Sequence, residues 1–371
     1  MARKTVCLNM IVKDEAHVIR RCLDSLRTLI DTWVIVDTGS SDGTQALIRE
    51  LLRDIPGRLF ERPWKDFAHN RSEAIELARG SADYLLFIDA DDLFEAPAGF
   101  RMPPLSGDAY DIVIEYAETV YRRVCLVNNA LPWRWVGVLH EYLECDAPFR
   151  IEPLEGLCMR IGGGGGRSRI DEQEKYTRDA EILERALAAD PGNTRYAFYL
   201  AQSWRDCGQF EKALAAYRHR AGMTGGFDEE VFCSLLESAR LMSRLGHGMA
   251  EVVAGFLQAF DCRPGRAEPL GELALYFRHQ GPHWPLAYLF ASRAVELPMP
   301  GDLLFVERHW YDWRCRDEYA IAAYWVGEYE KSRQVSEQLL NSGKLPEAER
   351  QRVVENLGFA RERLGLPASS A

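Results

Sequence analysis

No stretch of the sequence approaches the ~20 consecutive apolar residues that a membrane-spanning helix requires. The apolar run at 5–12 is shorter, and no small-residue cleavage pattern of a signal peptide follows it. Closely spaced cysteine pairs are also lacking, because none of the nine cysteines stands in a Cys-x-x-Cys motif. An odd number of widely spaced cysteines is typical of buried thiols in a reducing compartment, not of a disulfide framework or a zinc site. We therefore expect a cytoplasmic protein.

An excess of basic residues is lacking as well. The sequence has 45 Lys and Arg against 56 Asp and Glu, a formal net charge of −11. This balance disfavours nucleic acid and anionic membranes as partners, because clustered Lys and Arg usually meet such surfaces. It leaves room for a nucleotide diphosphate, whose site needs only a metal ion and one or two cations.

The length of 371 residues exceeds a single typical core, so we expect two domains. In the N-terminal part, apolar strands alternate with amphipathic helices. The expected strands are 6–12, 33–37, 59–60 and 84–89, and the expected helices are 15–26, 44–52 and 70–79. This alternation predicts a parallel sheet with helices on its faces, whose ligands bind beyond the carboxyl ends of the strands. Two longer β-like pieces follow, at 110–127 and 131–143.

Five consecutive glycines at 162–166 follow these strands. They fit either a flexible linker or a mobile loop that edges an active site, and both interpretations predict mobility because no side chain restrains the backbone. We place the domain boundary here, with one domain at 1–165 and the other at 166–371.

From residue 171 onward the pattern is helical only and contains an internal repeat. Its clearest unit has tetratricopeptide spacing at Leu200, Ala201, Trp204, Gly208, Phe210, Ala213 and Tyr217. The same spacing returns at 319–329 and, less closely, at 273–290 and 238–246. Small residues let two helices cross closely, and aromatic residues fill the gap between hairpins that stack into a solenoid. The aromatic segment 310–314 fits core filling better than a binding groove.

Polar side chains follow two of the expected strands. Asp37 ends one strand and begins Asp-Thr-Gly-Ser-Ser-Asp-Gly-Thr at 37–44, where it can accept hydrogen bonds from a ribose or a base. Ser40, Ser41 or Asp42 can cap the helix that starts there. The alternative is a polar turn with an ordinary helix cap.

The third long strand ends in Asp-Ala-Asp-Asp at 89–92. Neighbouring carboxylates raise one another's pKa, and a divalent cation removes that cost. Hard oxygen ligands suit Mg²⁺ or Mn²⁺, which would also bridge two phosphates. Strand alternation would send Asp89 and Asp91 to one face and Asp92 to the other. The alternative, surface acid, is disfavoured by the position at the end of an apolar strand.

A third group is Trp-Arg-Trp-Val-Gly-Val-Leu-His-Glu at 133–141. Its aromatic residues suit packing against a sugar face. The segment ends in His140 and Glu141, which can complete a metal site or act as a base. The alternative is an exposed strand end.

Four motifs together resemble a family 2 glycosyltransferase with the GT-A fold. They are Asn-Met-Ile-Val-Lys-Asp-Glu at 9–15, the segment 34–44, His-Asn-Arg at 69–71 and Phe-Ile-Asp-Ala-Asp-Asp at 87–92. The sequence is most similar to the subgroup in which this domain is fused to tetratricopeptide repeats, which includes peptide glycosyltransferases acting on bacteriocin cysteines. The resemblance implies a Rossmann-like α/β nucleotide-sugar domain followed by an all-α, tetratricopeptide-like solenoid.

The resemblance also implies roles for single residues. Glu15 and Asp37 would contact the nucleoside, Asp89 the ribose, and Arg71 the diphosphate, with Lys13 near the donor. Three further positions of these motifs are assigned to donor binding, namely Ser40, Asp42 and Ala90.

The metal and the base follow from the same resemblance. Asp91 would hold Mn²⁺ or Mg²⁺, and His140 is the candidate for another ligand. Glu141 is the candidate base, with Asp92 and Glu144 as rivals, because the acidic pair that ordinary members carry further along has no match here. Family members generally invert the anomeric configuration by a single displacement.

Neither transmembrane helices nor the Gln-x-x-Arg-Trp motif of processive members is found, which favours the addition of one or a few sugars. UDP is the favoured nucleotide, with dTDP and GDP still open. The repeats favour a macromolecular acceptor, a peptide, protein or glycan, and they also suit a homodimer. The alternatives are a sugar-phosphate nucleotidyltransferase and a non-catalytic interaction protein with a relic first domain.

Overall fold

The computed structural model describes residues 3–116, 119–164, 171–281 and 283–367 of the protein. The chain divides into two compact units, residues 1–208 and 209–371, each of which is described here by itself. The predicted domain boundary between residues 165 and 166 lies outside the described residues. Because the first unit ends at residue 208, it contains the sheet together with the first two long helices.

The strands of the first unit follow the expected apolar runs. They are β1 (Val6–Val12), β2 (Thr32–Asp37), β3 (Gly57–Glu61), β4 (Tyr84–Phe87), β5 (Leu93–Glu95), β6 (Ala109–Tyr116), β7 (Thr119–Asn128), β8 (Trp133–Val136), β9 (Tyr142–Cys145) and β10 (Ile151–Arg160). The two long β-like pieces of the sequence are thus four strands, because each piece turns back on itself.

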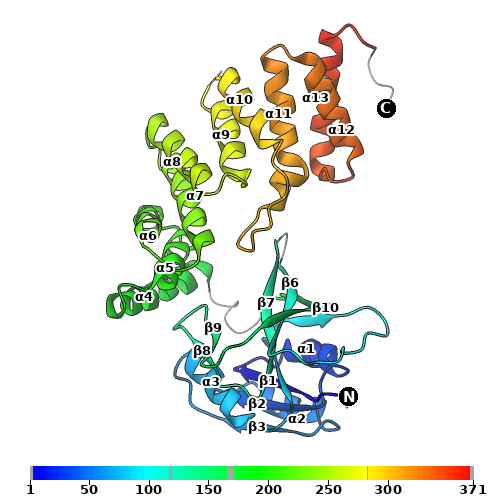
Figure 1. Ribbon diagram of the computed structural model, residues 1–371, viewed down its shortest axis with the longest axis vertical. Helices are drawn as coiled ribbons and strands as arrows, with labels where there is room; N and C mark the ends of the chain where they lie inside the picture. Colours follow the sequence, from blue (N-terminus) through cyan, green and yellow to red (C-terminus); the bar gives the residue numbers. More distant parts are fainter. Residues whose placement is uncertain (1–2, 117–118, 165–170, 282, 368–371) are drawn as a thin grey trace. The chain divides into compact units, whose positions relative to one another are not determined.

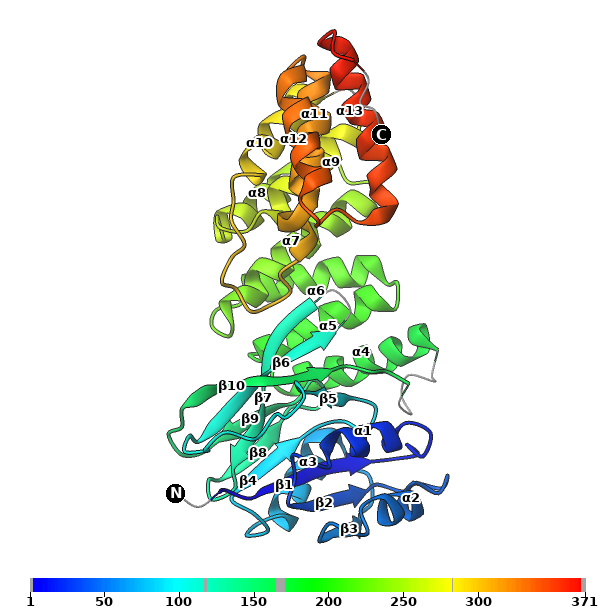
Figure 2. The ribbon, with the colours of Figure 1, turned by 90° about the vertical axis from the view of Figure 1, so that its right-hand side faces the viewer.

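The main sheet has eight strands in the order β3-β2-β1-β4-β7-β6-β10-β5. The first four are parallel, as the alternation of strands and helices predicted. Beyond β4 the sheet is mixed, because β7 pairs antiparallel with both β4 and β6, while β10 runs parallel to β6. Strands β8 and β9 form a separate antiparallel pair. Figure 2 shows the parallel strands side by side.

Helices cover the two faces of the parallel part. They are α1 (Ile19–Leu26), α2 (Thr44–Leu51) and α3 (Phe67–Leu77). Apolar residues of α1 and α2 share one core with alternate residues of β1, such as Leu8 and Met10. The opposite face, with Cys7 and Val34, packs against α3 and Trp133 of β8. Alternating side chains of the buried strands thus build two cores, one on each face of the sheet. The helices α1, α2 and α3 are labelled in Figure 1.

The rest of the described chain is helical, as expected. The helices are α4 (Glu172–Ala189), α5 (Thr194–Asp206), α6 (Phe210–Gly222), α7 (Asp228–Arg244), α8 (Met249–Cys262), α9 (Glu268–His279), α10 (Trp284–Ala294), η2 (Trp310–Arg314), α11 (Cys315–Trp325), α12 (Tyr329–Asn341) and α13 (Glu347–Arg363). The tetratricopeptide prediction is confirmed: Ala201, Ala213 and Tyr217 are fully buried between helices, and Gly208 takes the left-handed turn that its position requires.

The aromatic segment 310–314 is core, as favoured. It forms the π-helical turn η2, in which Trp310 and Trp313 are buried. Trp310 packs so closely on Gly271 of α9 that a Cβ there would lie 2.4 Å from the indole ring. Packing of the Trp310 ring against Gly271 therefore holds η2 close to α9.

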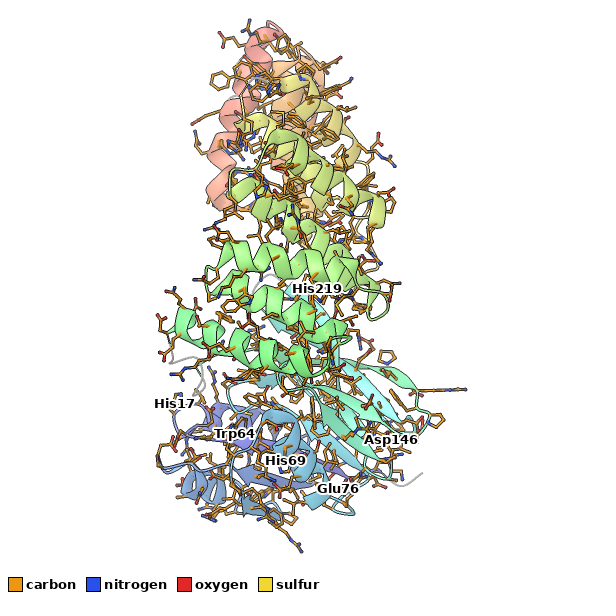
Figure 3. The ribbon with its side chains drawn as sticks, turned by 90° about the vertical axis from the view of Figure 1, so that its left-hand side faces the viewer. His17, Trp64, His69, Glu76, Asp146 and His219 are labelled. Atoms are coloured by element: carbon orange, nitrogen blue, oxygen red, sulfur yellow. The ribbon has the colours of Figure 1, made fainter. Side chains whose placement is uncertain are left out.

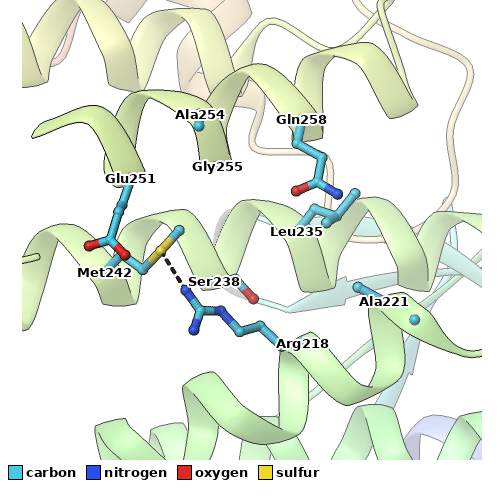
Figure 4. A pocket seen from close by; sticks show the side chains of 10 residues that line it. Arg218, Ala221, Leu235, Ser238, Met242, Glu251, Ala254, Gly255 and Gln258 are labelled. Atoms are coloured by element: carbon cyan, nitrogen blue, oxygen red, sulfur yellow. Dashed lines mark hydrogen bonds between the residues drawn. The ribbon is translucent and has the colours of Figure 1, made fainter. Parts of the chain in front are cut away.

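A cleft of about 360 Å³ opens between α6, α7 and α8 (Figure 4). There Arg218 donates to Met242 Sδ at 2.9 Å. Six of the nine cysteines are buried and Cys262 is exposed, and burial raises the pKa of the Cys7 thiol to about 11. None of the described helices combines the length and hydropathy that a membrane-spanning segment needs.

Candidate active site

Asp37, at the end of β2, is almost completely buried by the loop that follows the strand. Asp37 is 1% exposed, and its Oδ1 accepts hydrogen bonds from Gly39 N, Ser40 N and Gln45 Nε2 at 2.9–3.0 Å. Its Oδ2 has no hydrogen-bond partner among the described residues. A buried acceptor of this kind is costly unless a ligand satisfies it. Asp37 is therefore built to receive a hydroxyl or N–H donor from a bound molecule.

The predicted donor-binding residues Ser40 and Asp42 hold two loops together. Ser40 Oγ accepts from Asp14 N at 2.9 Å, and Asp42 Oδ2 accepts from Ala16 N at 2.9 Å. Asp42 Oδ1 also accepts from Thr44 N, the first amide of α2, at 3.0 Å. Both side chains thus fix the loop that follows β1, and their direct contact with a donor stays a prediction.

That loop carries the predicted Lys13 and Glu15. Glu15 N donates to Thr44 Oγ1 at 2.8 Å, and Asp14 adopts a left-handed backbone with φ 54°. The Glu15 side chain is half-buried, whereas Lys13 is exposed. Because β1 and β2 are adjacent and parallel, this loop and Asp37 lie at the same edge of the sheet.

The acidic motif 89–92 leaves the strand early. β4 ends at Phe87, and Asp92 N donates to Asp89 O at 3.1 Å, which closes a turn. Residues 89–92 thus form a turn and not the end of a strand, so strand alternation does not set the directions of these carboxylates. Asp89 and Asp91 are half-buried, while Ala90 and Asp92 are buried.

Asp92 is the most enclosed of these acids. It is 3% exposed, and its Oδ1 accepts from Gly162 N at 3.2 Å. Burial, followed by the charges of Asp89 and Asp91, raises the pKa of Asp92 to about 7. A carboxyl with a pKa near neutrality can exchange a proton at physiological pH.

Arg71 is the centre of the ion pairs at this edge. From α3, its guanidinium bonds Asp89 Oδ1 and donates from Nε to Glu141 Oε1 at 2.7 Å. It also lies over the Trp135 ring, 5.1 Å from the centroid. Burial raises the pKa of Asp89, but the charges of Arg71 and Arg123, together with the hydrogen bond from Arg71, outweigh burial and lower the pKa overall. The structure thus joins three predicted residues, Arg71, Asp89 and Glu141, in one cluster.

The predicted metal ligand His140 precedes Glu141 in the loop between β8 and β9. Its exposed ring stacks on Tyr199 of α5, with centroids 3.8 Å apart. Glu144, the rival base, forms an ion pair with Arg134 on the same hairpin. Metal binding by His140 and a catalytic role for Glu144 stay predictions.

The described part of the glycine run, 162–164, is held in place. Arg21 of α1 donates to Asp91 O at 2.6 Å and to Gly163 O at 2.7 Å. His17, at the surface of the first unit (Figure 3), bonds Gly164 O. These contacts place the run at the rim of the acidic turn, so the interpretation as an active-site edge fits better than the free linker. Residues 165 and 166 lie outside the described part.

Two arginines near the acidic turn were not predicted. Arg21 contacts it directly, and the charge of Arg123, on β7, helps to lower the pKa of Asp89. A sequence signal existed for Arg123, because Arg122 and Arg123 interrupt an otherwise apolar strand. Arg21 looked like an ordinary solvent-facing helix residue.

No group of three His, Cys, Asp or Glu residues that could hold a metal occurs among the described residues. Mg²⁺ in nucleotide sites is often bound through one or two carboxylates together with substrate phosphates. Asp91, at the open side of the acidic turn, fits such a site. These features define a GT-A domain joined to tetratricopeptide-like hairpins.

Comparison with known proteins gives the family. Residues 7–98 match Glycosyl transferase family 2, and the chain carries a domain of that family. A TPR repeat-containing protein of Synechococcus elongatus is 39% identical over 209 residues, which make up 52% of this chain and 49% of that protein. The SPbeta prophage-derived glycosyltransferase SunS of Bacillus subtilis is 30% identical over 225 residues, 57% of this chain and 51% of SunS. The chain thus spans about half the length of these curated relatives.

A shorter match is to the lipopolysaccharide core biosynthesis glycosyltransferase LpsC of Rhizobium meliloti. It is 32% identical over 109 residues, 29% of this chain and 37% of that protein. Among solved structures, BtubC of P. vanneervenii aligns with a TM-score of 0.40 and 17% identity, over 54% of this chain and 85% of BtubC.

Proposed function

We propose that the protein is a metal-dependent glycosyltransferase that moves a sugar from a nucleotide-diphosphate donor to a macromolecular acceptor. One observation carries the proposal: within a family 2 domain, buried Asp37 and the Arg71–Asp89 pair lie at the carboxyl edge of the parallel strands. Ligands of such sheets bind at that edge. Asp37 Oδ2 would accept from the nucleoside, Asp89 would contact the ribose, and Arg71 would neutralise the diphosphate.

We expect Mn²⁺ or Mg²⁺ at Asp91. The bound ion would stabilise the negative charge of the departing diphosphate. Arg21 donates a hydrogen bond to the backbone carbonyl of Asp91. This bond would orient the Asp91 side chain and leave its carboxylate oxygens available to the ion. His140 as a second ligand stays a prediction.

The reaction would be a single displacement with inversion. The acceptor nucleophile forms a bond to the anomeric carbon, the bond to the diphosphate oxygen breaks, and a carboxylate takes the acceptor's proton. Glu141 and Asp92 are the two candidate bases. Glu141 is held in an ion pair with Arg71, whereas Asp92 has a pKa of about 7 but is enclosed. Comparing transfer by Glu141→Gln and Asp92→Asn at saturating donor separates them, because only loss of the base should abolish transfer once the donor is bound.

The helical hairpins would bind the acceptor, a peptide, protein or glycan. The names of two relatives, SunS and LpsC, are those of glycosyltransferases, which supports the reaction and leaves the acceptor to experiment. UDP is the proposed nucleotide. A homodimer through the repeats and a cytoplasmic location stay predictions.

The decisive experiment is a calorimetric titration with UDP-glucose, UDP-N-acetylglucosamine, dTDP-glucose and GDP-mannose, each with Mn²⁺ and with a chelator. We expect one nucleotide class to bind, with affinity that depends on Mn²⁺ and is lost in Asp91→Asn. Asp146→Asn is the matched control, since Asp146 is an exposed acid of the same unit that pairs with Arg134 (Figure 3).

Two results would overturn the proposal. Absence of binding by every donor at millimolar concentration would favour a relic domain whose repeats do the work. Mn²⁺-independent binding that survives Asp91→Asn would contradict the metal assignment.

A further inference from the structure

We propose that Arg195 and Tyr199, on the helix α5, are positioning residues of the donor site. They hold the loop between β8 and β9 in the conformation that presents Glu141 to Arg71. The consequence for donor binding rests on the function proposed above, whereas the consequence for the loop does not.

The loop has a backbone that its own residues do not favour. Gly137 has φ 114°, and His140, which carries a Cβ, has φ 51°. A non-glycine residue in this region costs about 1–2 kcal/mol, so other contacts must maintain it. Because β8 and β9 are only four residues each, the hairpin by itself supplies little of that support.

The support comes from α5. The guanidinium of Arg195 donates to His140 O from Nε at 3.1 Å and from Nη2 at 2.8 Å. The same guanidinium lies over the rings of Tyr142 and Tyr199, at 5.1 and 4.9 Å from their centroids. Arg195 therefore contacts the loop's backbone and the first residue of β9 at once.

Tyr199 holds the side chain of the same loop residue. The His140 ring stacks on the Tyr199 ring with an interplanar angle of 9° and a centroid distance of 3.8 Å. Arg195 and Tyr199 lie one helical turn apart on α5. Arg195 thus fixes the carbonyl of His140, and Tyr199 fixes its ring. Two independent contacts on one strained residue leave its backbone little freedom to relax.

The next residue in the chain is Glu141. With His140 fixed, Glu141 reaches Arg71 Nε at 2.7 Å, and Arg71 in turn bonds Asp89 of the acidic turn. A chain of contacts therefore links Arg195 and Tyr199 to Arg71 through His140 and Glu141. We call this chain of contacts the relay. A helix of the tetratricopeptide kind would thereby serve the donor site, and α5 belongs to the same compact unit as the sheet.

The loop itself is tested by hydrogen–deuterium exchange on the full chain without ligand. We expect Arg195→Ala and Tyr199→Ala to speed exchange in peptides covering 133–145, with peptides of β1 unchanged. Tyr199→Phe keeps the stacked ring and should retain protection. The matched control is Arg185→Ala, which removes an exposed arginine of the neighbouring helix α4.

The donor site is tested by titration with UDP-glucose and Mn²⁺ in a double-mutant cycle of Arg195→Ala with Glu141→Gln. We expect Arg195→Ala alone to weaken binding about 10-fold to 100-fold, as loss of an outer-shell support commonly does. Added to Glu141→Gln, it should cost little more, because both changes break the same relay. A general structural defect would instead give additive losses. Arg195→Lys, which keeps one donor, should restore part of the affinity.

The outcomes are distinguishable. Unchanged exchange at 133–145 in both alanine variants overturns the positioning role whatever the donor. Changed exchange with fully additive binding losses overturns the relay to Arg71. If the parent protein binds no UDP-glucose, the proposed nucleotide is wrong, and the exchange result still decides the role of Arg195 and Tyr199.

Discussion

Glu141 Oε1 accepts a 2.7 Å hydrogen bond from Arg71 Nε, across 70 residues of sequence. The same guanidinium bonds Asp89, so one side chain of α3 joins the acidic turn to the loop between β8 and β9. Only about a tenth of the Arg71 side chain is exposed. A cation bound by two carboxylates joins these two segments, and under the proposed function it would also meet the charge of a diphosphate.

Replacing Arg71 should damage stability and donor binding together. Arg71→Met leaves Asp89 and Glu141 facing each other without a cation, and breaking a buried pair this way costs about 3–5 kcal/mol. Arg71→Lys keeps the charge but cannot make both bonds, so its loss of stability should be smaller. Urea unfolding measures the first effect and donor titration the second. Arg58→Met, an exposed arginine of β3, should change neither.

Asp37→Asn should weaken nucleoside binding while the loop stays intact. The Asn carbonyl can still accept from Gly39 N, Ser40 N and Gln45 Nε2, but the free acceptor Oδ2 becomes an N–H₂ donor. Losing a hydrogen bond to a charged group costs about 1.5–3 kcal/mol, or roughly 10-fold to 100-fold in affinity. Titration with the free nucleoside diphosphate measures it. Unaltered affinity would remove Asp37 from the donor site.

Asp92→Asn should make stability less sensitive to pH. The pKa of Asp92 is raised from 3.8 to about 7 in the folded chain, so the folded state binds a proton that the unfolded state has already released. Stability therefore falls as pH rises from about 4 to 7 and is constant above. Asparagine escapes this fall, so the variant should gain up to about 4 kcal/mol relative to the parent across that range.

The measurement is chemical denaturation at pH 5, 6, 7 and 8, in a chelating buffer so that no cation alters the carboxyl. The unfolding free energy of Asp92→Asn relative to the parent should be more favourable at pH 8 than at pH 5. A stability difference between variant and parent that stays constant from pH 5 to pH 8 would show that Asp92 is already ionised in the fold at pH 5 and would contradict the raised pKa.

Gly162→Ala should disturb the rim of the acidic turn. An added Cβ would lie 2.2 Å from Asp91 O and 2.5 Å from Arg21 Nη2, so the backbone at Gly162 must move away from Asp91 and Arg21. Overpacking of this kind costs about 1–3 kcal/mol, and donor affinity should fall with it. Gly192→Ala, whose Cβ would meet its nearest atom only at 4.0 Å, is the control for thermal unfolding and titration alike.

Gly271→Ala should destabilise the helical unit, because its Cβ would lie 2.4 Å from Trp310. We expect a loss of about 1–3 kcal/mol from this overpacking. Gly358→Ala in α13 meets nothing within 4 Å and should stabilise by up to about 1 kcal/mol through helix propensity. Thermal unfolding of the two variants should therefore shift in opposite directions, and equal shifts would contradict the packing at η2.

Local patterns predicted much of this protein correctly. The span of β1, the parallel order of the first four strands and the tetratricopeptide-like hairpins all follow from hydrophobic periodicity and turn residues, which act over a few neighbouring positions. Asp37 and Asp89 could be selected as candidate site residues because parallel strands bring their carboxyl ends to one edge, whereas Arg71 was selected from the family resemblance of His-Asn-Arg at 69–71. Those inferences need no knowledge of distant contacts.

The pattern misled where it extended the strand two residues too far. The run from Tyr84 to Asp89 reads as one strand, yet the strand ends at Phe87, because the sequence has no signal for the turn that Asp92 N closes on Asp89 O. The continuous β-like pieces likewise concealed two reversals. Apolar periodicity reports which face is buried, not where the chain turns.

The sequence by itself determined the α/β domain, the repeats and the motifs at the ends of the strands. Only the tertiary structure decided that Arg71 joins Asp89 to Glu141, that Arg21 grips the glycine run, and that Arg195 of α5 supports His140. The physical reason is range. Periodicity and caps are set by neighbours in the chain, whereas these contacts join residues 18 to 142 positions apart and depend on how loops close and elements pack.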